Sequence, residues 1–237
     1  GIVCTCDFGR DRVEELGIAR EKTCVTPNPG SPRRVGRGGG PGAARPPGRT
    51  ILTIGRAVPR KGFHLLVEAL SLLKKDIPDV RLIVVGEGEA LPALIEQIRS
   101  LGLEDRVVLA GTVEDEAELS RLYSECDLFI LANLFLDDGN CEGIPTVVVE
   151  ASAHGKPVIA GDNGGAPMAV RDGVSGYLLD PKDVPRMADM IKKVLLDPEL
   201  ARRLGEGGVR KVMEDHDPVK AGRRFSDFIR RIRKGEA

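Results

Sequence analysis

From Thr50 onward, short apolar runs rich in β-branched residues alternate with segments of helical period, and this alternation constrains the fold most strongly. The apolar runs read TILTIG, VRLIVVG, RVVLAG, DLFILA, KPVIAG and GYLLD. The segments of helical period include FHLLVEALSLLKK, EALPALIEQIRSLG, EAELSRLYSEC and VPRMADMIKKVLLD. Strands that are apolar throughout, when separated by amphipathic helices, indicate a mostly parallel sheet. We therefore predict an α/β fold with helices on both faces of that sheet.

Several of the predicted strands end in glycine, namely at Gly55, Gly86, Gly111 and Gly161. Ligands of open parallel sheets bind in the crevice beyond the carboxyl ends of the strands. Glycine at that edge lets the backbone come close to a ligand, and it serves a tight turn between strand and helix equally well. The sequence leaves both interpretations open for each glycine taken alone.

Two segments ahead of this repeat differ from it. Residues 1–30 read as strand, helix and strand, and because Gly1 lies inside the first strand we expect a fragment or a processed product. Residues 31–49 carry five Arg, no acidic residue and a single large aliphatic residue among many Gly and Pro. Such a segment buries too little apolar surface to offset its ordering entropy. This composition predicts a flexible linker.

Composition limits the partners and the compartment. The formal net charge of −1 and the absence of Trp, with two Tyr and six Phe, argue against nucleic acid as a partner. Five scattered cysteines favour a reducing compartment, and Cys4-Thr-Cys6 lacks the second cysteine pair and the nearby His of a metal site. No apolar run approaches the roughly 20 residues of a membrane span. We expect a cytoplasmic protein.

Residues 217–237 form a separate C-terminal element. Phe225, Phe228, Ile229 and Ile232 recur at helical spacing among five arginines, which predicts a basic amphipathic helix. We favour a helix that docks on its own protein or on a partner domain. The alternative is peripheral contact with the inner face of a membrane.

Two cations follow the first strand of the repeat. Arg56 comes directly after Gly55, and Lys61 and Gly62 come just before the next predicted helix. A helix N-terminus offers free backbone N–H groups and the positive end of the helix dipole, so cations beside it complete an anion site. Each cation taken alone is more often a solvated surface charge, so the interpretation rests on the pair.

The loops after the next two strands carry weaker signals. Gly86-Glu87-Gly88 ends the second strand, but Leu91 breaks the GxGxxG pattern of dinucleotide-binding proteins. Gly111-Thr112-Val113 ends the third strand and offers backbone groups that suit a nucleobase. A simple loop would have the same sequence.

The most specific pattern is the segment CEGIPTVVVEASAHG, which contains Glu142 and Glu150. Thr146 to Val149 is a β-branched run typical of a strand, yet Pro145 before it and Gly155 after it bracket a helix. We predict the helix, with Pro145 in its first turn. Amides at its start would then face a diphosphate. Glu150, one turn inside the helix, suits hydrogen bonds from vicinal sugar hydroxyls.

At this point the chain resembles glycosyltransferase family 4, retaining enzymes of GT-B architecture. The segments that carry the resemblance span residues 50–215, and the E-x7-E spacing of Glu142 and Glu150 is the most diagnostic. They are ILTIGRAVPRKGFHLLVEAL, LIVVGEGE, VVLAGTV, LSRLYSECDLFILAN and EGIPTVVVEASAHGKPVIAGDNGGAPMAVRDGVSGYLLDP. The resemblance implies a Rossmann-like C-terminal half of a GT-B fold. It implies a remnant of the acceptor domain at 1–30, a linker at 31–49, a donor-binding domain at 50–216 and the helix at 217–237.

The resemblance also implies the role of each site residue. Arg56 and Lys61 would bind the donor diphosphate and stabilise its departure, and Glu142 would face the transferred sugar. Glu150 would hold the ribose, and Val113 and its neighbours the base. The full set of implied donor-binding residues is Gly55, Gly86, Gly88, Thr112, Val113, Gly143, Ile144, Pro145, Thr146, Val147 and Glu150. No metal and no cofactor are implied besides the nucleoside-diphosphate sugar, for which GDP-mannose is one candidate.

The departures from the family pattern limit the activity expected of this chain. Ile144-Pro145 stands where many relatives carry Phe-Gly, and Pro145 lacks an amide donor. Nearly all of the acceptor domain is absent, so we expect this chain alone to be inactive and its glycan or lipid acceptor to bind elsewhere. The three histidines, His64, His154 and His216, are assigned to structure.

Two other functions compete with a retaining hexosyltransferase. The first is a non-catalytic module that binds a nucleotide sugar and transfers nothing. The second is an NAD-binding Rossmann oxidoreductase, which the missing GxGxxG and the lack of an acidic residue at the end of VRLIVVG disfavour.

Overall fold

The computed structural model describes residues 1–27 and 49–235. The predicted linker lies outside these residues, except for Arg49, which is the first residue of strand β3. The predicted C-terminal element is described as far as Gly235.

Six parallel strands form the main sheet, in the order β5-β4-β3-β6-β7-β8. The strands are β3 (Arg49–Ile54), β4 (Val80–Val85), β5 (Val107–Leu109), β6 (Leu128–Leu131), β7 (Val158–Gly161) and β8 (Tyr177–Leu179). Each apolar run predicted to be a strand is one. The order is that of a Rossmann-type doubly wound sheet, in which the chain starts at the centre and winds to either side. The predicted fold class is therefore confirmed.

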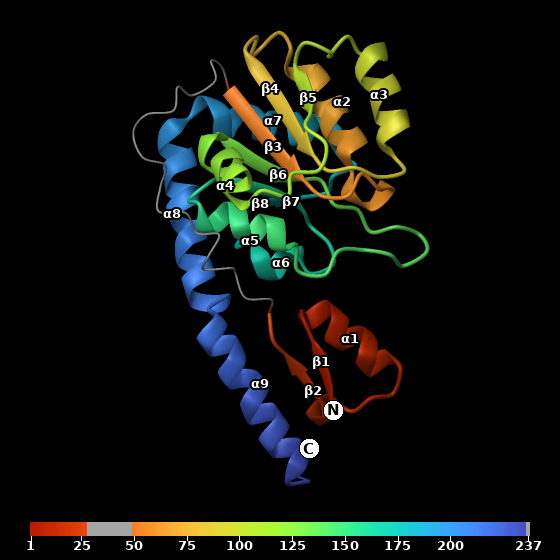
Figure 1. The fold of residues 1–237 in the computed structure, drawn as a ribbon, viewed down its shortest axis with the longest axis vertical. Helices are drawn as coiled ribbons and strands as arrows, with labels where there is room; N and C mark the ends of the chain where they lie inside the picture. Colours follow the sequence, from red (N-terminus) through yellow and green to blue (C-terminus); the bar gives the residue numbers. More distant parts are fainter. Residues whose placement is uncertain (28–48, 236–237) are drawn as a thin grey trace.

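Helices cover both faces of this sheet (Figure 1). Helix α2 packs against α3 and α7 on one face, while α4 and α5 lie on the other and α8 packs against α5. The helices of this domain are α2 (Phe63–Leu73), α3 (Leu91–Ser100), α4 (Glu116–Glu125), α5 (Thr146–Ala153), α6 (Ala166–Ala169), α7 (Val184–Leu196) and α8 (Pro198–Asp215), with a 3-10 turn η2 (Pro59–Lys61).

The core lies between the sheet and these two helix layers. Ile51 and Leu52 of β3 and Leu128 and Phe129 of β6 are fully buried although neighbouring side chains point to opposite faces. Burial on both faces explains why the central strands are apolar throughout rather than alternating. Each such side chain contributes roughly 1.5–3 kcal/mol through its removal from water.

A second, two-stranded parallel sheet holds the N-terminal segment, with Val3 of β1 paired to Cys24 of β2. Its elements are β1 (Ile2–Cys4), α1 (Asp7–Glu15), the 3-10 turn η1 (Arg20–Lys22) and β2 (Thr23–Val25). Helix α9 (Pro218–Arg233) continues from α8 and runs beside this sheet (Figure 1). Phe228 of α9 is buried, and Arg231 donates to the carbonyl oxygen of Glu21 at 3.3 Å.

The C-terminal helix is thus docked on its own chain, as favoured from its sequence. Phe225 and Ile229, which belong to the same apolar stripe as Phe228, remain exposed. Within residues 1–27 and 49–235, we find no helix whose length and apolar character would let it cross a membrane.

Candidate functional site

The strand order of the main sheet reverses between β3 and β6, and the loops that follow these two strands pack against each other. The amide of Leu134, after β6, donates to the carbonyl oxygen of Arg60, after β3, at 2.7 Å. Gly62 has a φ of +64°, and a Cβ there would collide with the carbonyl oxygen of Ala132. Only glycine fits this close approach. The reversal point of such a sheet is where ligands bind.

The loops after β3, β4 and β5 join the same edge. The amide of Gly55 donates to Val85, and the amide of Gly86 donates to the carbonyl oxygen of Gly111, at 2.9 and 2.7 Å. The amide of Ala57 donates to Glu87 at 2.9 Å. Two of the predicted donor-binding glycines therefore approach protein backbone closely, Gly86 at the carbonyl of Gly55 and Gly88 at the carbonyl of Ala57. Beyond them, Thr112 is exposed and Val113 is half-buried.

At the centre of this edge, the Glu142 carboxylate lies between two cations. Its Oε2 is 3.0 Å from Nζ of Lys61, and its Oε1 is 3.1 Å from Nε of Arg60. The side chains of Arg60, Lys61 and Glu142 are 18%, 10% and 11% exposed. The η2 turn directs the two consecutive basic residues to the same carboxylate. Arg56, the other predicted cation, is exposed.

Burial changes the acid–base behaviour of Lys61. Its pKa lies below the ordinary 10.5, chiefly because burial disfavours the charged ammonium form. Attraction to Glu142 opposes this lowering, and repulsion from Arg60 and Arg56 adds to it. The aliphatic part of Lys61 passes over Gly55, where a Cβ would come within 3.1 Å of Cε. The side chain thus runs along the end of β3 toward Glu142.

The backbone of Glu142 is held by a hydrogen bond, and its side-chain oxygen Oε1 accepts none from residues 1–27 and 49–235. The amide of Gly165 donates to its carbonyl oxygen at 3.0 Å. Among the described residues, none donates a hydrogen bond to Oε1, so the contact with Arg60 is an ion pair without hydrogen-bond alignment. A buried carboxylate oxygen without a donor is costly to the protein. Oε1, which is itself buried, therefore has an unused capacity to accept a hydrogen bond.

The predicted helix after Glu142 is confirmed as α5, although the β-branched run favours a strand locally. Its first residue is Thr146, and Pro145 is the N-cap in an extended conformation, so the prediction that Pro145 lies in the first turn is wrong by one residue. The ring of Pro145 has no oxygen to cap the helix, and the first amides of a helix lack partners inside it. The amides of Thr146 and Val147 therefore lie at an uncapped helix start. Gly143 and Ile144 precede it, exposed and buried respectively.

Glu150 lies inside α5 and is held by a neutral partner. The hydroxyl of Tyr123, from α4, donates to Glu150 Oε2 at 2.9 Å. The ring of Tyr123 stacks on His154 at 5.1 Å. His154 contacts the Glu150 carbonyl oxygen through Nδ1 at 2.9 Å and Ser120 Oγ through Nε2 at 3.2 Å. His154 therefore has the structural role expected of it.

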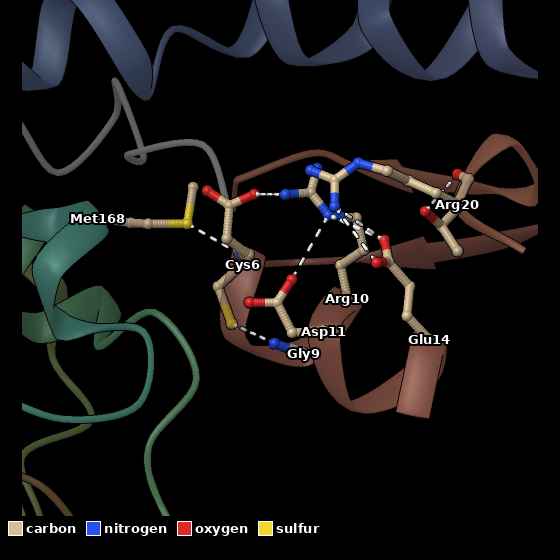
Figure 2. A network of polar contacts seen from close by, with 9 residues as sticks. Cys6, Gly9, Arg10, Asp11, Glu14, Arg20 and Met168 are labelled. Carbon is tan, nitrogen blue, oxygen red and sulfur yellow. Dashed lines mark hydrogen bonds and ion pairs between the residues drawn. The ribbon is translucent and has the colours of Figure 1, made fainter. Parts of the chain in front are cut away.

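The N-terminal segment meets this edge through the start of α1 (Figure 2). The amide of Asp7 donates to Sδ of Met168 at 3.0 Å, and Cys6 Sγ caps α1 by accepting from Gly9. Behind this contact, Arg10 is paired with Asp7 at 2.5 Å and with Glu14 at 3.6 Å. Nearer the site, Thr5 Oγ1 lies 3.6 Å from the position of a Cβ on Gly143.

Sequence reasoning missed two residues of this site, Arg60 and Tyr123. Arg60 is adjacent to Lys61, but in regular structure consecutive side chains diverge, and only the 3-10 turn brings both to Glu142. Tyr123 gives one signal, as one of only two tyrosines in the chain. In the part of the chain that the structure describes, no three or more His, Cys, Asp or Glu side chains are grouped as a metal site. That the reaction needs no metal stays a prediction.

Comparison with known proteins identifies the family of this fold. The sequence profile described as "Glycosyl transferases group 1" matches residues 42–211. The GDP-mannose-dependent alpha-(1-6)-phosphatidylinositol monomannoside mannosyltransferase of Mycolicibacterium smegmatis is 33% identical over 180 residues, covering 76% of this chain and 47% of that protein. The chain spans about half the length of the curated relatives it matches.

Solved structures share the fold over nearly the whole chain. Anabaena HepE in complex with UDP has a TM-score of 0.81 at 24% identity, covering 96% of this chain and 62% of that one. Sucrose-phosphate synthase from Thermosynechococcus elongatus has a TM-score of 0.83 at 23% identity, covering 98% of this chain and 58% of that one. At these identities the likeness concerns the fold alone.

Proposed function

Because this chain belongs to the group 1 glycosyl transferases, we propose that it forms the donor site of a retaining glycosyltransferase that uses a nucleoside-diphosphate sugar. One observation carries the proposal. The buried Glu142 lies between Arg60 and Lys61 next to the uncapped start of α5. Lys61 and the free amides suit a diphosphate, and a carboxylate suits a sugar hydroxyl.

The donor lies along α5 in this proposal. The amides of Thr146 and Val147, together with Lys61 and the exposed Arg56, hold the diphosphate. Glu150 lies four residues beyond Thr146, or roughly 6 Å along the helix axis, and accepts hydrogen bonds from the ribose hydroxyls. Glu142 faces the transferred sugar. The loop at Thr112 and Val113, with the glycine loops beside it, receives the base.

Catalysis follows from charge stabilisation. As the bond between the anomeric carbon and the diphosphate breaks, Arg56 and Lys61 stabilise the negative charge that develops on the leaving group. The acceptor hydroxyl bonds to the anomeric carbon from the face of the leaving group and gives its proton to the departing diphosphate, so the configuration is retained. The residues named here position and stabilise, and none acts as a nucleophile.

The names of the relatives suggest the substrates to try. A mannosyltransferase that depends on GDP-mannose is 33% identical, and HepE binds UDP. We propose a glycan or lipid acceptor, held by an N-terminal acceptor domain. A cytoplasmic location is part of the same proposal. Contact with the inner face of a membrane is assigned to the exposed Phe225 and Ile229 of α9.

Calorimetric titration with GDP, UDP, ADP and NAD tests the donor site. We expect at least one nucleoside diphosphate to bind and NAD not to bind. Binding of NAD alone would refute the glycosyltransferase proposal in favour of an oxidoreductase.

Lys61→Ala and Glu150→Ala test the proposed contacts. Each removes a charge-assisted hydrogen bond to the donor, so each should weaken binding of the nucleoside diphosphate by roughly 1.5–3 kcal/mol. Lys192→Ala is the matched control, because Lys192 forms an exposed pair with Asp76 on another surface. Unchanged affinity in both site variants would contradict the assignment.

A non-catalytic binding module is the second candidate, since the chain spans about half the length of its curated relatives. It binds the same nucleotides. Assays for release of free nucleoside diphosphate from GDP-mannose or UDP-glucose, with and without added glycan or lipid acceptors, separate the two. Binding without release in every assay favours the module.

A further inference from the structure

Arg60 contacts the candidate site through Glu142. Its Nε lies 3.1 Å from Glu142 Oε1, while Lys61 Nζ lies 3.0 Å from the other oxygen. One carboxylate therefore pairs with two cations that follow each other in the sequence, and one positive charge is left over. Neither the predicted donor contacts nor the proposed mechanism uses Arg60.

The donor diphosphate and Glu142 compete for Lys61. In the structure the ammonium group is directed to the carboxylate. When an anionic diphosphate arrives, Lys61 has to turn toward it, wholly or in part. A buried carboxylate that loses its only counter-charge is strongly destabilised, because little solvent is present to replace the partner. Without a second cation, Glu142 would either keep Lys61 from reaching the diphosphate or move its own carboxylate out of the site.

Arg60 is a second cation that can keep the Glu142 carboxylate paired when Lys61 turns away. Arginine carries a permanent positive charge in proteins. The backbone of Arg60 is fixed, because its carbonyl oxygen accepts the amide of Leu134 at 2.7 Å and the η2 turn ends at the tightly packed Gly62. Glu142 is likewise tied by the amide of Gly165 at 3.0 Å. The backbones that carry Arg60 and Glu142 therefore stay in place without Lys61, and the ion pair between the two side chains does not depend on it.

We infer that Arg60 is a positioning residue, which holds the Glu142 carboxylate in place when Lys61 turns to the donor diphosphate. The inference rests on the proposed function. It assigns Arg60 no contact with the donor. If Arg60 instead binds the phosphates directly, its removal has the same effect whether or not Glu142 carries a charge.

A double-mutant cycle separates these two roles, with free GDP and UDP as probes because they require Lys61 and no sugar contact. Arg60→Ala should weaken binding about tenfold, as expected for loss of a buried charged partner. In a Glu142→Gln background the same change should cost no more than about threefold, because no carboxylate competes for Lys61. Arg60→Lys should recover most of the affinity, since a cation next to Glu142 is what matters.

The matched control is Arg99→Ala, which removes an arginine from an exposed ion pair with Glu96 on α3. Melting temperatures of all variants show whether they fold, and Arg60→Gln replaces Arg60→Ala if alanine unfolds the protein. Equal losses in both backgrounds, or wild-type affinity in Arg60→Ala, would overturn the inference while leaving the donor site intact. A wild-type chain that binds neither GDP nor UDP fails at the proposed function itself, and the role of Arg60 falls with it.

Discussion

Glu142 and Glu150 are the same residue type, eight positions apart, and they are buried to nearly the same extent, with 9% and 7% of each residue exposed. Their surroundings differ. Glu142 lies in a loop between two cations. Glu150 lies inside a helix and accepts a hydrogen bond from the neutral hydroxyl of Tyr123.

This difference gives the two carboxylates different chemistry. Around Glu142, the two cations Arg60 and Lys61 outnumber the one carboxylate. The surplus positive charge suits an anion, and the carboxylate weakens its attraction. Around Glu150, the hydroxyl partner fixes the orientation of a carboxylate that adds negative charge of its own, which suits uncharged hydroxyl donors and repels phosphate. Under the proposed function, the spacing of the two glutamates therefore predicts where the charged diphosphate of the donor meets its neutral sugar groups.

The largest expected effect that tests the contrast between Glu142 and Glu150 is on the stability of the folded protein. Glu142→Ala leaves Arg60 and Lys61 buried without their shared counter-charge, so the free energy of unfolding should fall by about 3 kcal/mol. Urea denaturation measures it. Free nucleoside diphosphates should nevertheless bind at least as tightly, because Lys61 is released. A loss of both stability and diphosphate affinity would show that Glu142 does not compete with the anion.

The neutral partner of Glu150 should be worth less. Tyr123→Phe removes one hydrogen bond to a buried carboxylate, and the free energy of unfolding should fall by about 1.5 kcal/mol. Glu150→Gln, whose side-chain oxygen can still accept from the tyrosine, is the matched control and should cost less. If Tyr123→Phe destabilises as much as Glu142→Ala, the two sites do not differ in the way described.

The smallest effect concerns the pH dependence of diphosphate binding. The pKa of Lys61 is below 10.5 because of burial, so its charge is lost at a lower pH than that of an exposed lysine. Affinity should be constant below that pKa and fall as pH rises through it, by about twofold where half of the lysine is neutral. Lys61→Arg stays charged and corrects for titration of the nucleotide itself. Parallel alkaline profiles of wild type and Lys61→Arg would contradict the shift.

The fold was predictable because its signal is local and repeated. Strands buried on both faces have to be apolar throughout, and helices with one buried face have to show helical period. The same logic placed α5 correctly, since Pro145 and Gly155 limit the segment more strongly than the preference of Val147 to Val149 for a strand. The predicted start of α5 was wrong by one residue, because proline fits both the cap position and the first turn of a helix.

Features that depend on tertiary contact could not be predicted. No helix was assigned to Pro198–Asp215, whose three glycines lower its helix propensity. In the fold they are required, because a Cβ on Gly205 would collide with the carbonyl oxygen of Gly155 beneath α8. The convergence of Arg60 and Lys61 on one carboxylate likewise depends on a turn and on a loop some eighty residues away. The domain boundaries and the role of each site residue stay predictions.

The docking of α9 on the N-terminal sheet has a consequence for biosynthesis. Arg231 and Glu21, which are in contact, are 210 positions apart in the sequence. At about 5–20 residues per second, a ribosome needs roughly 10–40 s to make that stretch. During this time β1, α1 and β2 exist without the helix that covers them, whereas each strand of the main sheet soon meets its neighbour. The sheet of β1 and β2 is thus completed only after α9 has been made, and until then the surface that α9 covers stays open to chaperones and proteases.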